Sequence, residues 1–129
     1  MNRILIIDDD KDVLDTLSLI LEIGGYDILG LLEVDSLNEN IKTFKPDLIV
    51  LDVVLGNIDG RSICNQLKQN PVTKSIPILM MSGLLEMKKV NENTIGPDDF
   101  ISKPFEMENF VSKVTKLIAQ KKSKDYTIN

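Results

Sequence analysis

The sequence has 129 residues, of which 43% are hydrophobic and 27% are charged, and its net charge is −5. This composition is typical of a single soluble globular domain that can bury a core, and it argues against a disordered chain. The negative charge argues against a general binder of nucleic acid or of anionic membranes, and no apolar run approaches the roughly 18 residues of a membrane span.

Histidine is absent from the sequence and cysteine occurs once, at Cys64. The first fact excludes histidine-based acid–base catalysis by this chain, and the second excludes an internal disulfide. We expect Cys64 to be a small core residue on a helix. Together with the lack of a signal peptide before Arg3, these features favour a cytoplasmic domain.

Short and nearly continuous apolar runs alternate with longer amphipathic segments along the chain. Such runs are typical of strands that are covered on both faces. They predict strands at Ile4–Ile7, Ile28–Leu32, Leu48–Leu51 and Ile76–Met81, with a shorter fifth candidate at Phe100–Ile101.

Helical patterns lie between these strands. The first follows Lys11 and is closed by Gly24–Gly25, and the second begins at Ser36-Leu-Asn-Glu39, which has the spacing of a capping box. Three further helices are expected at Gly60–Gln69 before Pro71, at Leu85–Asn93 with a weak pattern, and at Phe110–Ile118 after Glu106 and Glu108. We therefore expect one domain over residues 1–121 and a polar, frayed C-terminal tail over 122–129.

Strands that alternate with helices imply a parallel sheet with right-handed crossovers, and hence a three-layer α/β domain with a five-stranded parallel sheet. Ligand sites in such folds lie at the carboxyl ends of the strands. Polar residues stand at four of these ends, namely Asp8, Asp9 and Asp10, then Asp52, then Ser82, and finally Lys103.

Each of these residues has an ordinary structural explanation when it is taken alone. A single aspartate after a strand is usually a helix N-cap, and this suits Asp10. It does not explain three consecutive acids, because like charges about 4 Å apart repel by on the order of 4 kcal/mol at an effective dielectric of about 20. Polar groups at four strand ends along one edge favour a functional site.

The chemistry of these groups points to phosphoryl transfer. Carboxylates at a sheet edge are the oxygen ligands that Mg²⁺ prefers. An aspartate beside such a metal can attack phosphorus and form an acyl phosphate. Mg²⁺, the Lys103 ammonium and the Ser82 hydroxyl would then each take one of the three phosphoryl oxygens.

Four segments in this order resemble the receiver domain of response regulators in two-component signalling: "ILIIDDD", "PDLIVLDVVLGNIDG", "IPILMMSG" and "DDFISKPF". The similarity runs from Arg3 to about Ile118. It implies a flavodoxin-like (βα)5 fold with strand order 2-1-3-4-5. It also implies a phosphoacceptor that assists only its own phosphorylation and slow dephosphorylation, and not an enzyme with a separate substrate.

The resemblance also implies a role for each matching residue. Asp52 would accept a phosphoryl group from a phosphohistidine on a sensor histidine kinase or a histidine phosphotransfer protein. Asp9 and Asp52 would bind Mg²⁺ directly, Asp8 mainly through water, and the backbone carbonyl of Val54 would be a third protein ligand.

The switch elements of the family match Ser82 as the hydroxyl, Lys103 as the phosphate-binding lysine and Phe100 as the aromatic residue. We expect a cis peptide bond between Lys103 and Pro104, because the lysine must point back over the strand edge while the chain turns into the last helix. The expected output is a downstream effector protein or an effector domain, with no direct contact of this chain to nucleic acid or membrane.

Several positions depart from the family pattern. Gly56-Asn57 stands where Pro-Gly is usual, so we expect a turn that still forms but is looser. The segment between Ser82 and Lys103 is one residue short of the common length, and Pro97 replaces the usual alanine, so the fourth helix is expected to be short or shifted. No effector domain follows, which indicates either a single-domain regulator or a piece of a longer protein.

Two apolar residues are expected to control how long the phosphoryl group persists. Val54 and Leu84 match the positions two residues after the phosphorylated aspartate and two after the switch hydroxyl. Neither side chain can orient a water for in-line attack, so spontaneous dephosphorylation should be slow.

Other protein classes fit these residues less well. An FMN-binding flavodoxin would have to receive a phosphate where three acids stand. A dehalogenase-type phosphatase would need a second acid at Val54, and a P-loop NTPase would need a glycine-rich lysine motif that is absent. The serious alternative is a receiver-like interaction module that works without phosphorylation.

Overall fold

The computed structural model describes residues 2–83 and 96–125. Its central sheet has five parallel strands in the order β2-β1-β3-β6-β7. The strands are β1 (Arg3–Ile7), β2 (Asp27–Leu31), β3 (Leu48–Asp52), β6 (Ile78–Ser82) and β7 (Asp99–Ser102). Counted along the chain, this is the predicted order 2-1-3-4-5, so the flavodoxin-like arrangement is confirmed.

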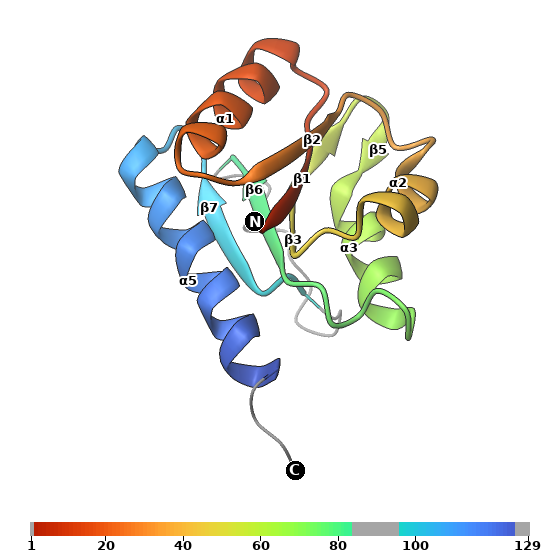
Figure 1. The fold of residues 1–129 in the computed structure, drawn as a ribbon. Coiled ribbons are helices and arrows are strands. Elements are labelled where there is room, and N and C mark those ends of the chain that lie inside the picture. The colour runs from red at the N-terminus through yellow and green to blue at the C-terminus, as the bar shows by residue number, and fades with distance from the viewer. Residues whose placement is uncertain (1, 84–95, 126–129) are drawn as a thin grey trace.

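Helices cover both faces of this sheet, as Figure 1 shows. One face packs against α1 (Lys11–Ile23) and α5 (Met107–Asp125), and the other against α2 (Leu37–Phe44) and α3 (Gly60–Gln69). Successive residues of a strand point to opposite faces, so Ile4 and Ile6 join the first core cluster while Leu5 and Ile7 join the second. This double burial explains why the strands are apolar throughout.

The single cysteine belongs to this core, as expected. Cys64 lies on α3 and is buried among the residues of the second cluster. Burial raises the pKa of its thiol to about 11, so the side chain is a protonated, apolar filler at neutral pH.

The predicted helix ends are confirmed in α1 and corrected in α2. Asp10 caps α1, since its carboxylate accepts from the amides of Asp12 at 3.0 Å and Val13 at 3.4 Å, and Gly25 follows the helix with φ 96°. Ser36 precedes α2, but its side chain makes no capping hydrogen bond. Asn40 instead donates to the Ser36 backbone oxygen at 2.8 Å, so the capping-box prediction was wrong.

A short hairpin follows β3 and was not predicted. β4 (Val54–Leu55) pairs antiparallel with β5 (Ile58–Asp59). Gly56 occupies the first turn position with φ 60°, while Asn57 has no positive φ, which is the arrangement of a type II′ hairpin. The Gly56-Asn57 turn therefore forms, as expected, and it does so within a paired hairpin.

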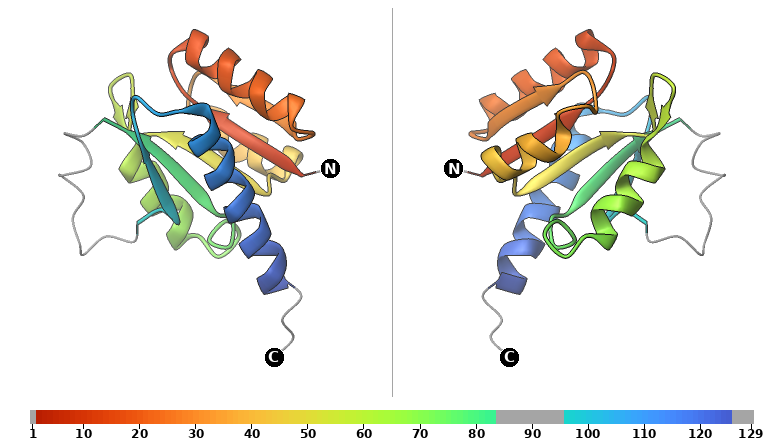
Figure 2. Two further views of the ribbon diagram at one scale, coloured as in Figure 1. Left: turned by 90° about the vertical axis from the view of Figure 1, so that its left-hand side faces the viewer. Right: turned by 90° about the vertical axis from the view of Figure 1, so that its right-hand side faces the viewer.

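The C-terminal helix is longer than expected. α5 runs to Asp125, four residues beyond the predicted domain end at 121, so the start of the predicted polar tail continues the helix. The side views show this helix extending past the edge of the sheet (Figure 2). None of the helices in the described ranges is long and apolar enough to cross a membrane. The predicted helix at Leu85–Asn93, like Leu84, lies outside the described residues.

Candidate functional site

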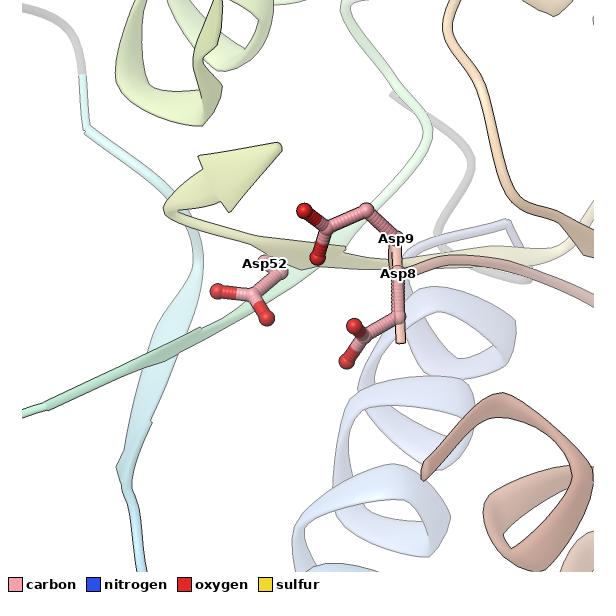
Figure 3. A group of neighbouring side chains, drawn as sticks. All are labelled: Asp8, Asp9 and Asp52. Carbon is pink, nitrogen blue, oxygen red and sulfur yellow. The ribbon is translucent and has the colours of Figure 1, made fainter. Parts of the chain in front are cut away.

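Three carboxylates meet at the carboxyl edge of the sheet, where β1 and β3 end side by side. Figure 3 shows Asp52 facing the consecutive pair Asp8 and Asp9. One oxygen from each of the three lies within 4.8 Å of the others. Asp8 is fully buried, Asp52 is 6% exposed and Asp9 is exposed to solvent. The structure thus brings together the acids that the sequence singled out, while Asp10 is the helix cap that its position suggested.

A backbone amide fixes each carboxylate. Asp8 Oδ1 accepts from the amide of Asp10 at 2.9 Å, and Asp52 Oδ1 accepts from the amide of Val54 at 3.0 Å. Asp9 Oδ2 accepts from the amide of Gly56 at 2.9 Å, across 47 positions of sequence. These bonds orient the three carboxylates.

Lys103 reaches the same carboxylates from the loop after β7. Its Nζ lies 2.5 Å from Asp52 Oδ2 and 3.4 Å from Asp8 Oδ2. Burial disfavours the ammonium, but the hydrogen bond and charge of Asp52, together with Asp8, outweigh burial and raise the pKa of Lys103. The Lys103–Pro104 peptide bond is cis, the isomer that the sequence predicted.

The electrostatics of Asp8 are dominated by its burial. Burial raises the pKa of its carboxyl to about 6, and the neighbouring Asp52 adds to the rise. The Asp10 amide and the charge of Lys103 oppose this shift without cancelling it. Keeping Asp8 ionised in this buried position therefore costs free energy.

Ser82 ends β6 at the same edge. It is 1% exposed, and its Oγ is the one buried side-chain polar atom without a hydrogen-bond partner in the described part of the chain. A buried hydroxyl without a partner is costly, and such an atom calls for an explanation. A ligand oxygen at this edge would supply the missing partner.

Two of the predicted site residues, Phe100 and Val54, have apolar side chains. Phe100, on β7, is half-buried and packs against the core cluster beneath α2 and α3. Val54 begins β4, and 47% of it is exposed. The other position expected to control hydrolysis, Leu84, is not among the described residues.

Gly60 is a site residue that the sequence did not reveal. A Cβ at this position would overlap the backbone oxygen of Asp52, and the Gly60 amide donates to the Val53 oxygen at 2.6 Å. The start of α3 therefore packs directly on the backbone that presents Asp52. The only signal in the sequence was a glycine at the first position of a predicted helix, which by itself says nothing of this contact.

The pattern of residues at this edge has counterparts in known proteins. The profile of the response regulator receiver domain matches residues 4–115. The chain belongs to this family. The receiver is thus a signalling domain of the two-component type, and the fold of solved receivers agrees with it. The signal receiver domain of a signal transduction histidine kinase from Syntrophus aciditrophicus superposes with a TM-score of 0.82 at 28% identity, covering 93% of this chain and 92% of that one.

Two regulators illustrate the sequence similarity of this receiver. The DNA-binding dual master transcriptional regulator RpaA of Synechocystis sp. is 36% identical over 92% of this chain and 49% of its own length. The alkaline phosphatase synthesis transcriptional regulatory protein PhoP of Bacillus subtilis is 35% identical over 90% of this chain and 48% of its own length. The chain spans about half the length of these curated relatives.

Proposed function

We propose that this receiver is a phosphoacceptor of a two-component or phosphorelay system, in which Asp52 takes a phosphoryl group from a kinase phosphohistidine with the help of Mg²⁺. One observation carries the proposal. The Lys103 ammonium lies 2.5 Å from a buried Asp52 carboxylate, at an edge that also holds Asp8, Asp9 and a Ser82 hydroxyl that has no hydrogen-bond partner among the described residues. A candidate nucleophile, a cluster of oxygen ligands suited to a metal and two groups for phosphoryl oxygens thus lie at one edge of the sheet.

The donor set fits a hard divalent cation. Three carboxylates and one ammonium leave a formal charge of −2 when all four are ionised. Asp9, Asp52 and the Val54 carbonyl would hold Mg²⁺ directly, and Asp8 would act through water. When bound, the ion would supply positive charge to the phosphoryl oxygens.

The transfer itself needs one bond to form and one to break. An Asp52 oxygen attacks the phosphorus while the bond from phosphorus to the imidazole nitrogen breaks, and that nitrogen keeps the electron pair. The 129 residues contain no histidine, so the donor belongs to a different polypeptide or to a part of a protein outside this sequence. Lys103 is placed to exchange its contact with Asp52 for one with a phosphoryl oxygen.

The same event supplies a switch. The Ser82 hydroxyl would donate a hydrogen bond to a phosphoryl oxygen, a partner that this buried atom does not find in the described part of the chain. Its movement would vacate space for Phe100, which is half-buried beside the second core cluster. Phosphorylation would then change the surface formed by the predicted fourth helix, which lies outside the described residues, together with β7 and α5. An effector protein or an effector domain could recognise this change.

Val54 is proposed to lengthen the life of the acyl phosphate, together with Leu84. The Val54 side chain is exposed beside Asp52 and offers no hydrogen bond to an attacking water. Replacing the pair by Val54→Asn and Leu84→Glu should speed the decay of the phosphorylated protein. Equal decay rates would show that these side chains do not protect the phosphorus.

Intact-mass measurement after incubation with Mg²⁺ and a small acyl-phosphate donor tests the proposed function. The wild type should gain the mass of one phosphoryl group, and Asp52→Asn should not. Asp59→Asn is the matched control, because it makes the same change at an exposed aspartate and keeps an N-cap oxygen for α3. No gain in the wild type would favour the receiver-like interaction module that works without phosphorylation.

A further inference from the structure

Asp9 differs from its two neighbours in how it is held. Asp8 and Asp52 are buried, and each accepts from the amide two residues ahead, so local backbone geometry orients both. Asp9 is exposed, and in the described ranges the Gly56 amide is the one hydrogen-bond donor to its carboxylate. Its orientation therefore depends on a contact with a hairpin 47 positions away.

The hairpin that carries Gly56 is anchored through both of its strands. Leu55 is buried in the second core cluster, and Asp59 caps α3 by accepting from the Arg61 amide at 2.9 Å. Two residue pairs join its strands, Val54 with Asp59 and Leu55 with Ile58. The paired strands therefore fix the position of the turn. The backbone conformation of Gly56 within that turn points its amide at Asp9.

Without that amide, nothing described in the structure would keep Asp9 beside the other acids. Its charge is repelled by Asp8 and Asp52, and an exposed aspartate is free to choose the rotamer that points away. The hydrogen bond uses Oδ2 alone. A carboxylate has lone pairs on both oxygens, so Oδ1 stays available to a cation while Oδ2 remains bonded to Gly56.

We propose that the Gly56 amide is the positioning group for Asp9, and that it couples the β4–β5 hairpin to the divalent-cation site. The coupling is reciprocal, because the free energy that links the hairpin conformation to cation binding is the same in both directions. An intact hairpin raises the affinity for the cation, and a bound cation stabilises the hairpin. The link to the cation rests on the proposed function, whereas the positioning of Asp9 does not.

Two glycines make a matched pair for the test. Gly56 and Gly25 both have positive φ, 60° and 96°, and a Cβ on either would meet nothing within 4 Å. Alanine is strained at both positions, so Gly25→Ala controls for a loss of stability that is not specific to the hairpin. Gly56→Ala should also weaken Mg²⁺ binding, measured by calorimetric titration, by about five-fold, which corresponds to ~1 kcal/mol. Gly25→Ala should stay within about two-fold of the wild type.

A second measurement needs no metal. The exchange of the Gly56 amide proton with water, followed by NMR, should be faster in Asp9→Ala than in the wild type and intermediate in Asp9→Asn, which keeps an acceptor oxygen. Mg²⁺ should slow the same exchange in the wild type. Failure of the wild type to bind Mg²⁺ would refute the proposed function. An exchange rate unchanged in Asp9→Ala, or equal Mg²⁺ affinities in the two alanine variants, would overturn the positioning by Gly56.

Discussion

Asp8 is a site residue whose ionisation lowers the stability of the fold. Its folded-state pKa of about 6 is above the ordinary value of 3.8, because the carboxyl is buried beside Asp52. Between these two pH values the folded state binds more protons than the unfolded state. The contribution of Asp8 to the free energy of unfolding therefore falls as the pH rises from about 4 to about 6, and the cost is complete above that window.

Asp8→Asn should consequently stabilise the protein at pH 7 when divalent cations are removed. The asparagine oxygen can still accept from the Asp10 amide, but no charge is buried. The free energy of unfolding should rise by up to about 3 kcal/mol, the value of a two-unit shift, and the advantage should vanish near pH 4. Urea unfolding in a chelator at both pH values measures this. Asp15→Asn, at an exposed position, is the control, and a less stable Asp8→Asn at pH 7 would contradict the assignment.

At the level of elements, two helix starts that look alike in sequence differ in structure. Asp10 has an extended backbone, φ −91° and ψ 111°, which aims its carboxylate at the amides of the first turn. Ser36 has φ −101° and ψ 14°, and its hydroxyl does not reach them. A capping pattern names the residue type, but the backbone angle before the helix decides whether the cap forms.

Asp10→Ala should therefore cost about 1 kcal/mol of unfolding free energy, whereas Ser36→Ala should cost only a few tenths. The reason is that only the first substitution leaves helix amides without an acceptor. Thermal and urea unfolding followed by circular dichroism compare the two variants directly. Equal losses would show that Ser36 caps α2 in solution.

The junction of β3 and α3 makes a sharper prediction. Gly60→Ala places a methyl group on the Asp52 backbone oxygen, so either the end of β3 or the start of α3 must move. We expect a loss of at least about 2 kcal/mol in unfolding free energy and a loss of phosphorylation. Gly96→Ala, where a Cβ meets nothing within 4 Å, should leave both unchanged. A Gly60→Ala protein with wild-type stability and phosphorylation would refute the contact.

Across the whole molecule, the sequence predicted the features that follow from hydrophobic periodicity. It missed a short hairpin and two close backbone contacts. Continuous apolar strands that alternate with helices predicted the sheet and its layers. The ends of the predicted strands located the polar residues that the structure places at one edge, namely Asp8, Asp9, Asp52, Ser82 and Lys103. The hairpin was missed because β4 and β5 are two residues long each, too short for any period to show. Gly56 and Gly60 act through backbone contacts with Asp9 and Asp52 that no spacing rule encodes.

Modification of Asp52 should also change the conformation of the neighbouring strands β6 and β7. Beryllofluoride, which mimics a bound phosphoryl group, should shift the NMR resonances of β7 around Phe100, because Ser82 and β7 are paired neighbours. In Ser82→Ala the shifts around Phe100 should be much smaller, while those of Asp52 itself persist. Resonances of β7 that do not respond in the wild type would mean that Phe100 is a packed residue in both states.

The most direct test of the central claim is to locate the modified atom. After reaction with a small acyl-phosphate donor and Mg²⁺, borohydride reduces an aspartyl phosphate to homoserine, which marks the residue permanently. Peptide fragmentation should place homoserine at position 52 and leave Asp8, Asp9 and Asp59 unchanged. Homoserine at another aspartate, or none anywhere after treatment with donor and Mg²⁺, would contradict the assignment of Asp52 as the phosphoacceptor.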